Sequence, residues 1–551
     1  MRAKVPTMPE ARHRGRPAAP GFAAGRVVAL GTAVVTRRAG GDPAREAAAL
    51  RAAMAKAAAE LAALAAGAAD DAAGILGFQI ALLEDDALSA PAFVAIEGGA
   101  PADVAWRDAL DDEIDGYRSA EDETFRARAA DLGDLRDRVL AQLGGDADGT
   151  AVAPPVAPGS IVAASDLPPS RFLAIDWRAG GAVLLSEGSR NSHVAMLARA
   201  RGVPMIVGLG IDPCCLAGEA LVDAMGGEFV LDPAPATRAA FEARRRSHEI
   251  GAAEAASRVG EPAVTADGVA VAVHINVAGP DELASLSPTI CDGIGLVRTE
   301  FLFAGEGLPD EETQYRVYRR LVEWAAGKPV TIRTLDAGGD KPVTGLTAVG
   351  ESNPFLGVRG IRLSLARPEV FAVQLRALAR AACHGALRIM LPMVTVPEEV
   401  EAARTLLDAT VAALEAAGVP ATRPPIGIMV EVPAAALAIE RFDAAFFSIG
   451  SNDLTQYVTA AGRDIAAVAE LANPLNPAVL RLIRMVVEHG RANGREVSLC
   501  GDAGGDPEAV GALLLAGLRS LSVAPAALSA TKSAISRIDL GRADSAAGKG
   551  R

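Results

Sequence analysis

Charged and polar residues recur directly after short apolar segments in the second half of the chain. The groups are Arg298-Thr299-Glu300, Arg333 to Asp336, Glu431, Ser451-Asn452-Asp453 and Cys500-Gly501-Asp502. Guanidinium groups bind phosphate and carboxylate oxygens in pairs, and carboxylates are oxygen ligands for Mg²⁺. A buried structural ion pair could explain any one group taken alone. All five together predict a site for a compact substrate that carries phosphate and carboxylate, with a divalent cation at Glu431 and Asp453.

A histidine, His193, marks a second candidate site. It stands where the polar turn Gly188 to Ser192 becomes an apolar-periodic helix. Asn191 or Ser192 can cap this helix, and N–H groups of its first turn would face an anion held on the imidazole. With an ordinary pKa of about 6.5, most of this imidazole is neutral at pH 7 and has a free lone pair. Two interpretations stay open from this stretch alone: a phosphoryl acceptor, or a capping or core histidine without chemistry.

Strands and helices alternate from Val264 to about Ile538, at the pace of a (β/α)₈ TIM barrel. The reacting groups of such barrels come from the C-terminal ends of different strands, which is where the polar groups fall here. The expected strands are Val269–Val277, Gly293–Val297, Val330–Thr334, Gly357–Leu363, Leu387–Met393, Ile426–Val430, Phe446–Ile449 and Val497–Cys500.

The first half of the chain predicts an α/β domain interrupted by helices. A strand at Gly25–Leu30 is followed by three or four helices between Pro43 and Leu143, and short strands return after Gly159. The helical segment is therefore an expected insertion. The expected boundaries are a disordered leader at 1–17, an α/β domain at 18–42 and 150–232, the helical insert at 43–149, a linker helix at 233–262, the barrel at 263–540 and a disordered tail at 541–551.

Charge and cysteine content narrow the class of protein. The 551 residues include 54 basic and 68 acidic side chains, a net charge of −14, so the balance does not favour a nucleic-acid surface, while an acidic docking face for a basic partner stays open. The five cysteines have neither metal-ligand spacing nor a disulfide framework, which favours a reducing cytoplasm. No run of about 18 apolar residues occurs, so we expect a soluble protein without a membrane span.

Several motifs resemble Enzyme I of the phosphoenolpyruvate-dependent sugar phosphotransferase system. Gly188 to Arg199 is similar to the Gly-Gly-x-Thr-Ser-His-x-x-x-x-Ala-Arg signature of its phosphohistidine domain, and Gly295 to Phe303 is similar to the run Gly-Leu-x-Arg-Thr-Glu-Phe-Leu. Further motifs follow in the family's order, at Ile332–Lys341, Asn353–Arg359 and Gly450–Tyr457. The resemblance extends from about Arg16 to Ile538.

The resemblance implies a phosphotransferase with a nitrogenous acceptor, which moves the phosphoryl group of phosphoenolpyruvate to its own histidine and then to the carrier HPr. His193 would carry the phosphoryl group, and Cys500 would protonate the methylene carbon as enolate becomes pyruvate. Substrate-binding residues would be Arg298, Arg333, Arg359, Asn452 and Arg463, and Mg²⁺ ligands would be Glu431 and Asp453. The resemblance further implies that the helical insert binds HPr and that the barrels form a homodimer.

Four residues depart from the family pattern: Ser189, Asn191, Phe172, which replaces a threonine that supports the imidazole, and Asp502, which replaces a glutamate. These departures give weight to an alternative, a catalytically impaired relative that acts as a regulatory HPr-binding protein. The retained arginines, carboxylates and cysteine argue against it. Pyruvate phosphate dikinase and phosphoenolpyruvate synthase share the histidine and the barrel, but they need an ATP-grasp domain for which this chain has no room.

Overall fold

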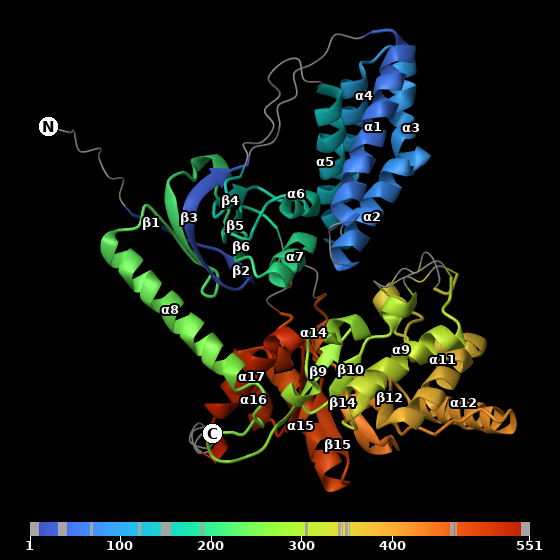
Figure 1. Ribbon diagram of the computed structural model, residues 1–551. Helices are drawn as coiled ribbons and strands as arrows, with labels where there is room; N and C mark the ends of the chain where they lie inside the picture. Colours follow the sequence, from blue (N-terminus) through green and yellow to red (C-terminus); the bar gives the residue numbers. More distant parts are fainter. Residues whose placement is uncertain are drawn as a thin grey trace. The chain divides into compact units, whose positions relative to one another are not determined.

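The structure is a computed structural model, and its contacts divide the chain into two units, residues 1–248 and residues 249–551 apart from 464–466 (Figure 1). Each unit is described by itself. The residues that the structure describes are 10–30, 41–66, 70–119, 123–144, 156–188, 192–303, 307–339, 343, 345–347, 351, 353–462, 468 and 471–541.

An eight-stranded sheet forms the α/β part of the first unit, in the order β1-β8-β7-β3-β4-β5-β6-β2. Residues of β4 alternate between two core clusters, with Val162 in one and Ile161 in the other, so both faces of the central strands are covered. The strand bounds are Ala11–Arg14, Arg16–Ala19, Phe22–Ala29, Ile161–Ala164, Ala182–Leu185, Met205–Val207, Glu219–Asp223 and Glu228–Leu231 for β1 to β8.

The expected disordered leader at 1–17 is wrong for its last part, because β1 and β2 lie there. Both are edge strands of the sheet. Arg12 and Arg14 are exposed on β1, and an Arg12 guanidinium nitrogen lies 3.2 Å from a Glu228 carboxylate oxygen on the neighbouring strand. Charged residues are common on edge strands because they discourage pairing with other chains. The basic composition therefore marks a sheet edge at these residues.

The helical insert lies between β3 and β4, which pair in parallel with Val27 opposite Ile161. Its described residues form five helices around one core, not the three or four expected. One extra break falls at Asp85, whose carboxylate accepts the N–H of Ala87 at 2.9 Å and so caps a new helix. The bounds are Pro43–Ala66, Asp70–Glu84, Asp86–Glu97, Ala102–Ser119 and Glu123–Gly144 for α1 to α5.

Three more helices follow in the first half of the chain. They are α6 at Pro169–Leu173, α7 at His193–Arg201 and α8 at Pro235–Ser257, and α8 falls inside the expected linker helix. In the second unit, the residues just after α8 are fixed by Lys532, whose ammonium donates to the carbonyls of Val259, Glu261 and Ile290 at 2.7 to 2.9 Å.

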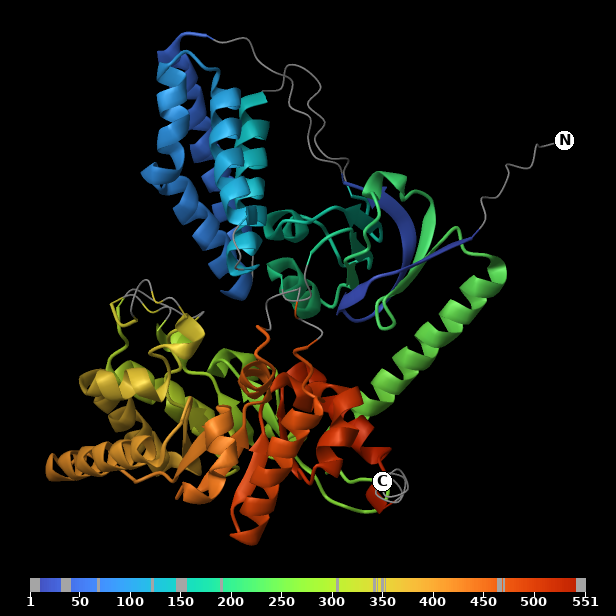
Figure 2. The same cartoon turned by 180° about the vertical axis from the view of Figure 1, so that it is seen from behind.

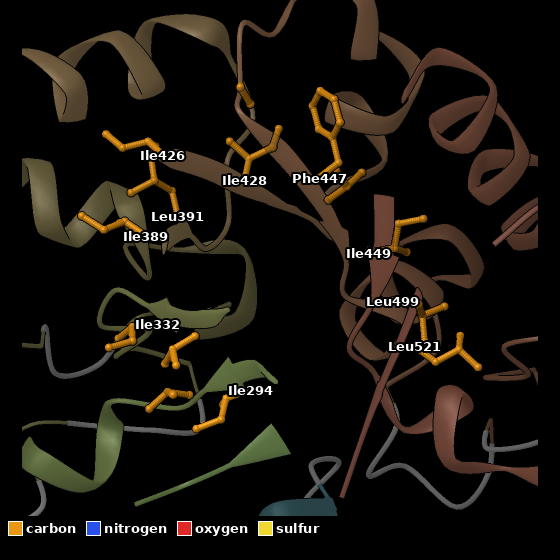
Figure 3. Close-up of a cluster of buried hydrophobic side chains, with 14 of the residues drawn as sticks. Ile294, Ile332, Ile389, Leu391, Ile426, Ile428, Phe447, Ile449, Leu499 and Leu521 are labelled. Carbon is orange, nitrogen blue, oxygen red and sulfur yellow. The ribbon is translucent and has the colours of Figure 1, made fainter. Parts of the chain in front are cut away.

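A closed barrel of eight parallel strands forms the second unit, in the order β10-β11-β12-β13-β14-β15-β16-β9. The outward side chains of these strands, such as Ile332, Ile428 and Leu499, belong to one large core cluster (Figure 3). The strand bounds for β9 to β16 are Ala272–Val277, Ile294–Val297, Val330–Arg333, Leu387–Leu391, Ile426–Val430, Phe446–Ile449, Glu496–Leu499 and Ser520–Val523.

Helices surround the barrel (Figure 2). Their bounds are Glu311–Trp324, Ile361–Ala366, Pro368–Ala381, Pro397–Ala416, Pro433–Leu437, Ser451–Thr459, Pro477–Ala492, Pro507–Leu515 and Leu528–Ser536 for α9 to α17. Searched over its described residues, the chain contains no helix that is both long and apolar enough to span a membrane.

The expected strand at Gly357–Leu363 is wrong, and the eighth strand is β16. Gly360 has φ +59°, and a Cβ there would lie 2.9 Å from the Cβ of Met393, so the backbone turns at this glycine and enters α10. Alternation of apolar and other residues at 357–363 resembled a strand. The real strand, Ser520–Val523, has buried serines at alternate positions.

A core substitution tests the packing of the insert. Leu110 is fully buried in its core, so we expect Leu110→Ala to lower the free energy of unfolding of the insert by about 2–5 kcal/mol. Urea unfolding read by the fluorescence of buried Trp106, with Trp177 and Trp324 replaced by Phe, measures this. Glu113→Ala, exposed on the same helix, is the control, and equal losses in both variants would contradict the packing described.

Candidate functional site

A buried ion network lies at the C-terminal end of the barrel strands. Arg333 ends β11, and Asp336 follows three residues later. One Arg333 guanidinium nitrogen lies 3.1 Å from Asp336 Oδ2, and the other lies 3.0 Å from Glu300 Oε1. Burial by itself would lower the pKa of Arg333, but Glu300 and Asp336 raise it well above its usual value. The guanidinium therefore stays charged inside the protein.

A second arginine, Arg359, reaches the same aspartate from the loop before α10. Its Nε lies 3.2 Å from Asp336 Oδ1 and its Nη2 lies 2.9 Å from Asp336 Oδ2. Nη2 also lies 3.5 Å from Asp453 Oδ2. Asp336 is fully buried and Arg359 is 1% exposed, so the fully desolvated carboxylate fixes both arginines in place.

Several polar atoms around this network have no hydrogen-bond partner among the described residues. They include Nε of Arg333, Nη1 of Arg359 and Oδ1 of Asp453, all buried. Buried polar atoms are normally paired, so unpaired ones in one cluster indicate a place where a ligand completes the hydrogen bonds. Two cationic donors and one anionic acceptor suit an anionic ligand together with a cation.

The two carboxylates predicted to bind a cation lie on neighbouring strand ends. Glu431 follows β13 and is 1% exposed, while Asp453 lies in the first turn of α14 and is 6% exposed. Burial, and then the nearby charges of Asp453 and Asp336, raise the pKa of Glu431 to about 8. Two buried carboxylates that repel each other would be stabilised by a cation between them.

The donors fit Mg²⁺. Among the described residues no group of three or more His, Cys, Asp or Glu side chains could hold a metal ion, so a cation here would have two protein carboxylates. Mg²⁺ typically takes one or two carboxylates and completes its shell with water and substrate oxygens. The glycine at position 450 leaves space beside the Glu431 carboxylate, because a Cβ at this position would lie 3.0 Å from Glu431 Oε2.

The predicted substrate contact Asn452 is held by Asp502. The Asn452 amide nitrogen donates to Asp502 Oδ2 at 2.9 Å, and the Asp502 N–H donates to Asn452 Oδ1 at 3.0 Å. The shorter carboxylate at position 502, noted above as a departure, therefore fixes the orientation of this amide.

Cys500 directly follows β15 and lies inside the barrel. It is 3% exposed and packs with Leu296, Met390 and Met429. Burial raises the pKa of its thiol to about 11. The sulfur therefore carries its proton at neutral pH, as a proton donor must.

Two further arginines were predicted to bind the substrate, and the structure describes one of them. Arg298 directly follows β10 and is exposed, while Arg463 lies outside the described residues.

The sequence analysis missed one residue that supports the site, Gln374, which is buried on α11. Its side-chain oxygen accepts the N–H of Leu335 at 3.1 Å and its amide nitrogen donates to Tyr318 at 3.1 Å, and these bonds fix the loop after β11. A glutamine inside a helix gives no sequence signal for such a role.

His193 begins α7, as predicted. Ser192 is the N-cap, and its hydroxyl accepts the N–H of Ala195 at 3.3 Å. Ser189 and Asn191 lie outside the described residues. Phe172, which departs from the family pattern, is a fully buried core residue, and its ring stacks on that of Trp177 with the ring centroids 5.1 Å apart.

Family models match three parts of the chain: the PEP-binding domain of PEP-utilising enzymes at residues 252–540, their N-terminal domain at 14–128 and their mobile domain at 156–214. A phosphoenolpyruvate-protein phosphotransferase of Bacillus sp. (strain S) is 36% identical over 88% of this chain and 86% of its own length. Proteins of the same name are 37% identical in Geobacillus stearothermophilus, over 88% and 86%, and 35% identical in Listeria innocua, over 85% and 83%. With this extent of identity and a barrel whose strand ends gather the arginines and carboxylates, the chain belongs to the phosphoenolpyruvate-protein phosphotransferase family, the Enzyme I proteins.

Proposed function

We propose that this chain takes the phosphoryl group from phosphoenolpyruvate onto His193 and passes it to a phosphocarrier protein, releasing pyruvate. The observation that carries the proposal is the pair of buried arginines on Asp336, with unpaired donors beside two carboxylates. A purely regulatory binding protein has no evident use for this arrangement. The arrangement of arginines and carboxylates supports a site for a small dianion and a cation.

The arginines bind the substrate in this proposal. Arg333 Nε and Arg359 Nη1 donate to phosphate and carboxylate oxygens, with Arg298 and Arg463 completing the set. Asn452, held by Asp502, orients the substrate. Fixed donors of this kind place the phosphorus in line for attack and neutralise charge as it develops.

Glu431 and Asp453 would hold Mg²⁺, which when bound would withdraw charge from the phosphoryl oxygens. The neutral imidazole of His193 attacks the phosphorus as the bond to the enol oxygen breaks. Cys500 then donates its proton to the methylene carbon of the enolate, giving pyruvate. N–H groups at the start of α7 favour the added negative charge on the histidine.

The finer assignments extend the same proposal. The carrier is HPr, bound by the helical insert, and the phosphohistidine domain moves between carrier and barrel. The protein works in the cytoplasm as a homodimer formed through the barrel. These assignments rest on the motifs shared with Enzyme I.

Phosphorylation tests the proposal directly. Incubation with ³²P-phosphoenolpyruvate and Mg²⁺ should label the protein with an acid-labile, base-stable group, because a phosphoryl group on imidazole has that stability. Labelling should vanish in His193→Ala and persist in His248→Ala, an exposed histidine on α8. Label retained by His193→Ala would overturn the assignment.

Cation binding should depend on pH. Because Glu431 is protonated below about pH 8 in the cation-free protein, Mn²⁺ affinity should fall about tenfold per pH unit below that value and level off above it. Titration of free Mn²⁺ by electron paramagnetic resonance between about pH 6 and 9 measures this. Glu431→Gln should bind weakly without that slope, and the exposed control Glu415→Gln should behave like the original protein. A flat profile in the original protein would contradict the role of Glu431.

A further inference from the structure

The inner face of β15 runs from solvent to the buried thiol of Cys500. Because alternate residues of a strand share a face, Glu496, Ser498 and Cys500 all point into the barrel. Exposure falls along this row: Glu496 is exposed, Ser498 is partly exposed and Cys500 is 3% exposed. The N-terminal end of the barrel therefore gives water access as far as Ser498.

A second serine joins this row to the thiol. On the parallel strand β14, Ser448 pairs in register with Ser498 and is 1% exposed. The Ser498 hydroxyl donates to Ser448 Oγ at 3.1 Å. Ser448 lies level with the residue two positions before Cys500 along these two strands, and its hydroxyl lowers the pKa of the thiol as a hydrogen-bond donor, which offsets part of the rise that burial causes. The sulfur lies 3.7 Å from the carbonyl oxygen of Ile449. The two hydroxyl groups thus lie in a row between the partly exposed end of β15 and Cys500.

We propose that Ser498 and Ser448 form a proton relay that returns a proton to Cys500 from the N-terminal end of the barrel. The inference rests on the proposed function, in which Cys500 protonates the enolate. A buried thiol that gives up its proton in every cycle needs a route by which the proton is replaced. Leu296, Met390, Met429 and Phe446, which pack with Cys500, have no hydroxyl group or ionisable side chain. The charged groups that also act on the thiol are Glu431, Arg333 and Arg298, and in the proposed function they bind the cation and the substrate.

The protons balance along this route. When the S–H bond of Cys500 breaks and the new C–H bond of pyruvate forms, a thiolate remains. Ser448 transfers its hydroxyl proton to that sulfur, takes the hydroxyl proton of Ser498, and Ser498 takes one from water. The net change is the consumption of one solvent proton for each pyruvate formed, and both serines return to their starting state.

A pair of variants of equal size isolates the hydroxyl. Ser448→Thr keeps a hydroxyl group, whereas Ser448→Val replaces it by a methyl group of similar volume. The measured reaction is deuterium exchange from D₂O into the methyl group of pyruvate with Mg²⁺, which needs repeated renewal of the thiol proton. Dividing this rate by the rate of His193 phosphorylation from phosphoenolpyruvate corrects for any damage to the fold.

We expect the ratio to fall about tenfold in Ser448→Val, part of the roughly 10²–10⁴-fold that general acid catalysis supplies. It should stay within about twofold of the original in Ser448→Thr and in Ser520→Ala, a buried serine on β16, two strands along the barrel from β14. Ser498→Ala, at a partly exposed position, should also lower the ratio and serves if Ser448→Val fails to fold.

Equal ratios for the Val and Thr variants, or an unchanged ratio in Ser498→Ala, would overturn the relay. Absence of phosphorylation in the original protein would instead overturn the proposed function.

Discussion

The barrel site depends on the ion pairs that one buried carboxylate, that of Asp336, makes with two guanidinium groups. Asp336 bonds both Arg333 and Arg359, and none of the three is more than 5% exposed. Arginine stays positively charged even when it is buried, so each buried guanidinium needs an anion beside it. Removing one member of such a buried pair typically costs about 3–5 kcal/mol. Asp336 thus lets two positive charges exist inside the protein in fixed positions.

The rest of the site is left incomplete around this core. Nε of Arg333, Nη1 of Arg359 and Oδ1 of Asp453 lack partners among the described residues, and Glu431 is held near a second carboxylate that raises its pKa. Each of these features destabilises the ligand-free protein. Such costs are typical of functional sites, where substrate and cation supply the missing interactions. The barrel and its large apolar core stabilise a region that is unfavourable by itself.

Sequence pattern predicted the barrel and the helices inserted into the α/β domain, because strand and helix periodicity are local signals. Polar residues after the strands and the motifs shared with Enzyme I supplied the candidate site residues. The pattern failed where tertiary packing decides. Gly357–Leu363 alternates like a strand but turns at Gly360 against Met393. Ser520–Val523 has serines at alternate positions, and only the fold shows that these serines are buried inside the barrel. The role of Asp336 depends on which strand ends lie together in the barrel. The contact of Ser448 with Ser498 depends on the register between β14 and β15, which cannot be predicted from either segment alone.

The arginines held by Asp336 and the two carboxylates should form one binding unit, in which the anion and the cation each complete the site for the other. Calorimetric titration with a phosphonate analogue of phosphoenolpyruvate, with and without Mg²⁺, measures this coupling most directly. We expect the analogue to bind at least about tenfold tighter with Mg²⁺, a coupling free energy of about 1.4 kcal/mol or more, and we expect this gain to be lost in Asp453→Asn. Equal affinity with and without Mg²⁺ would contradict it.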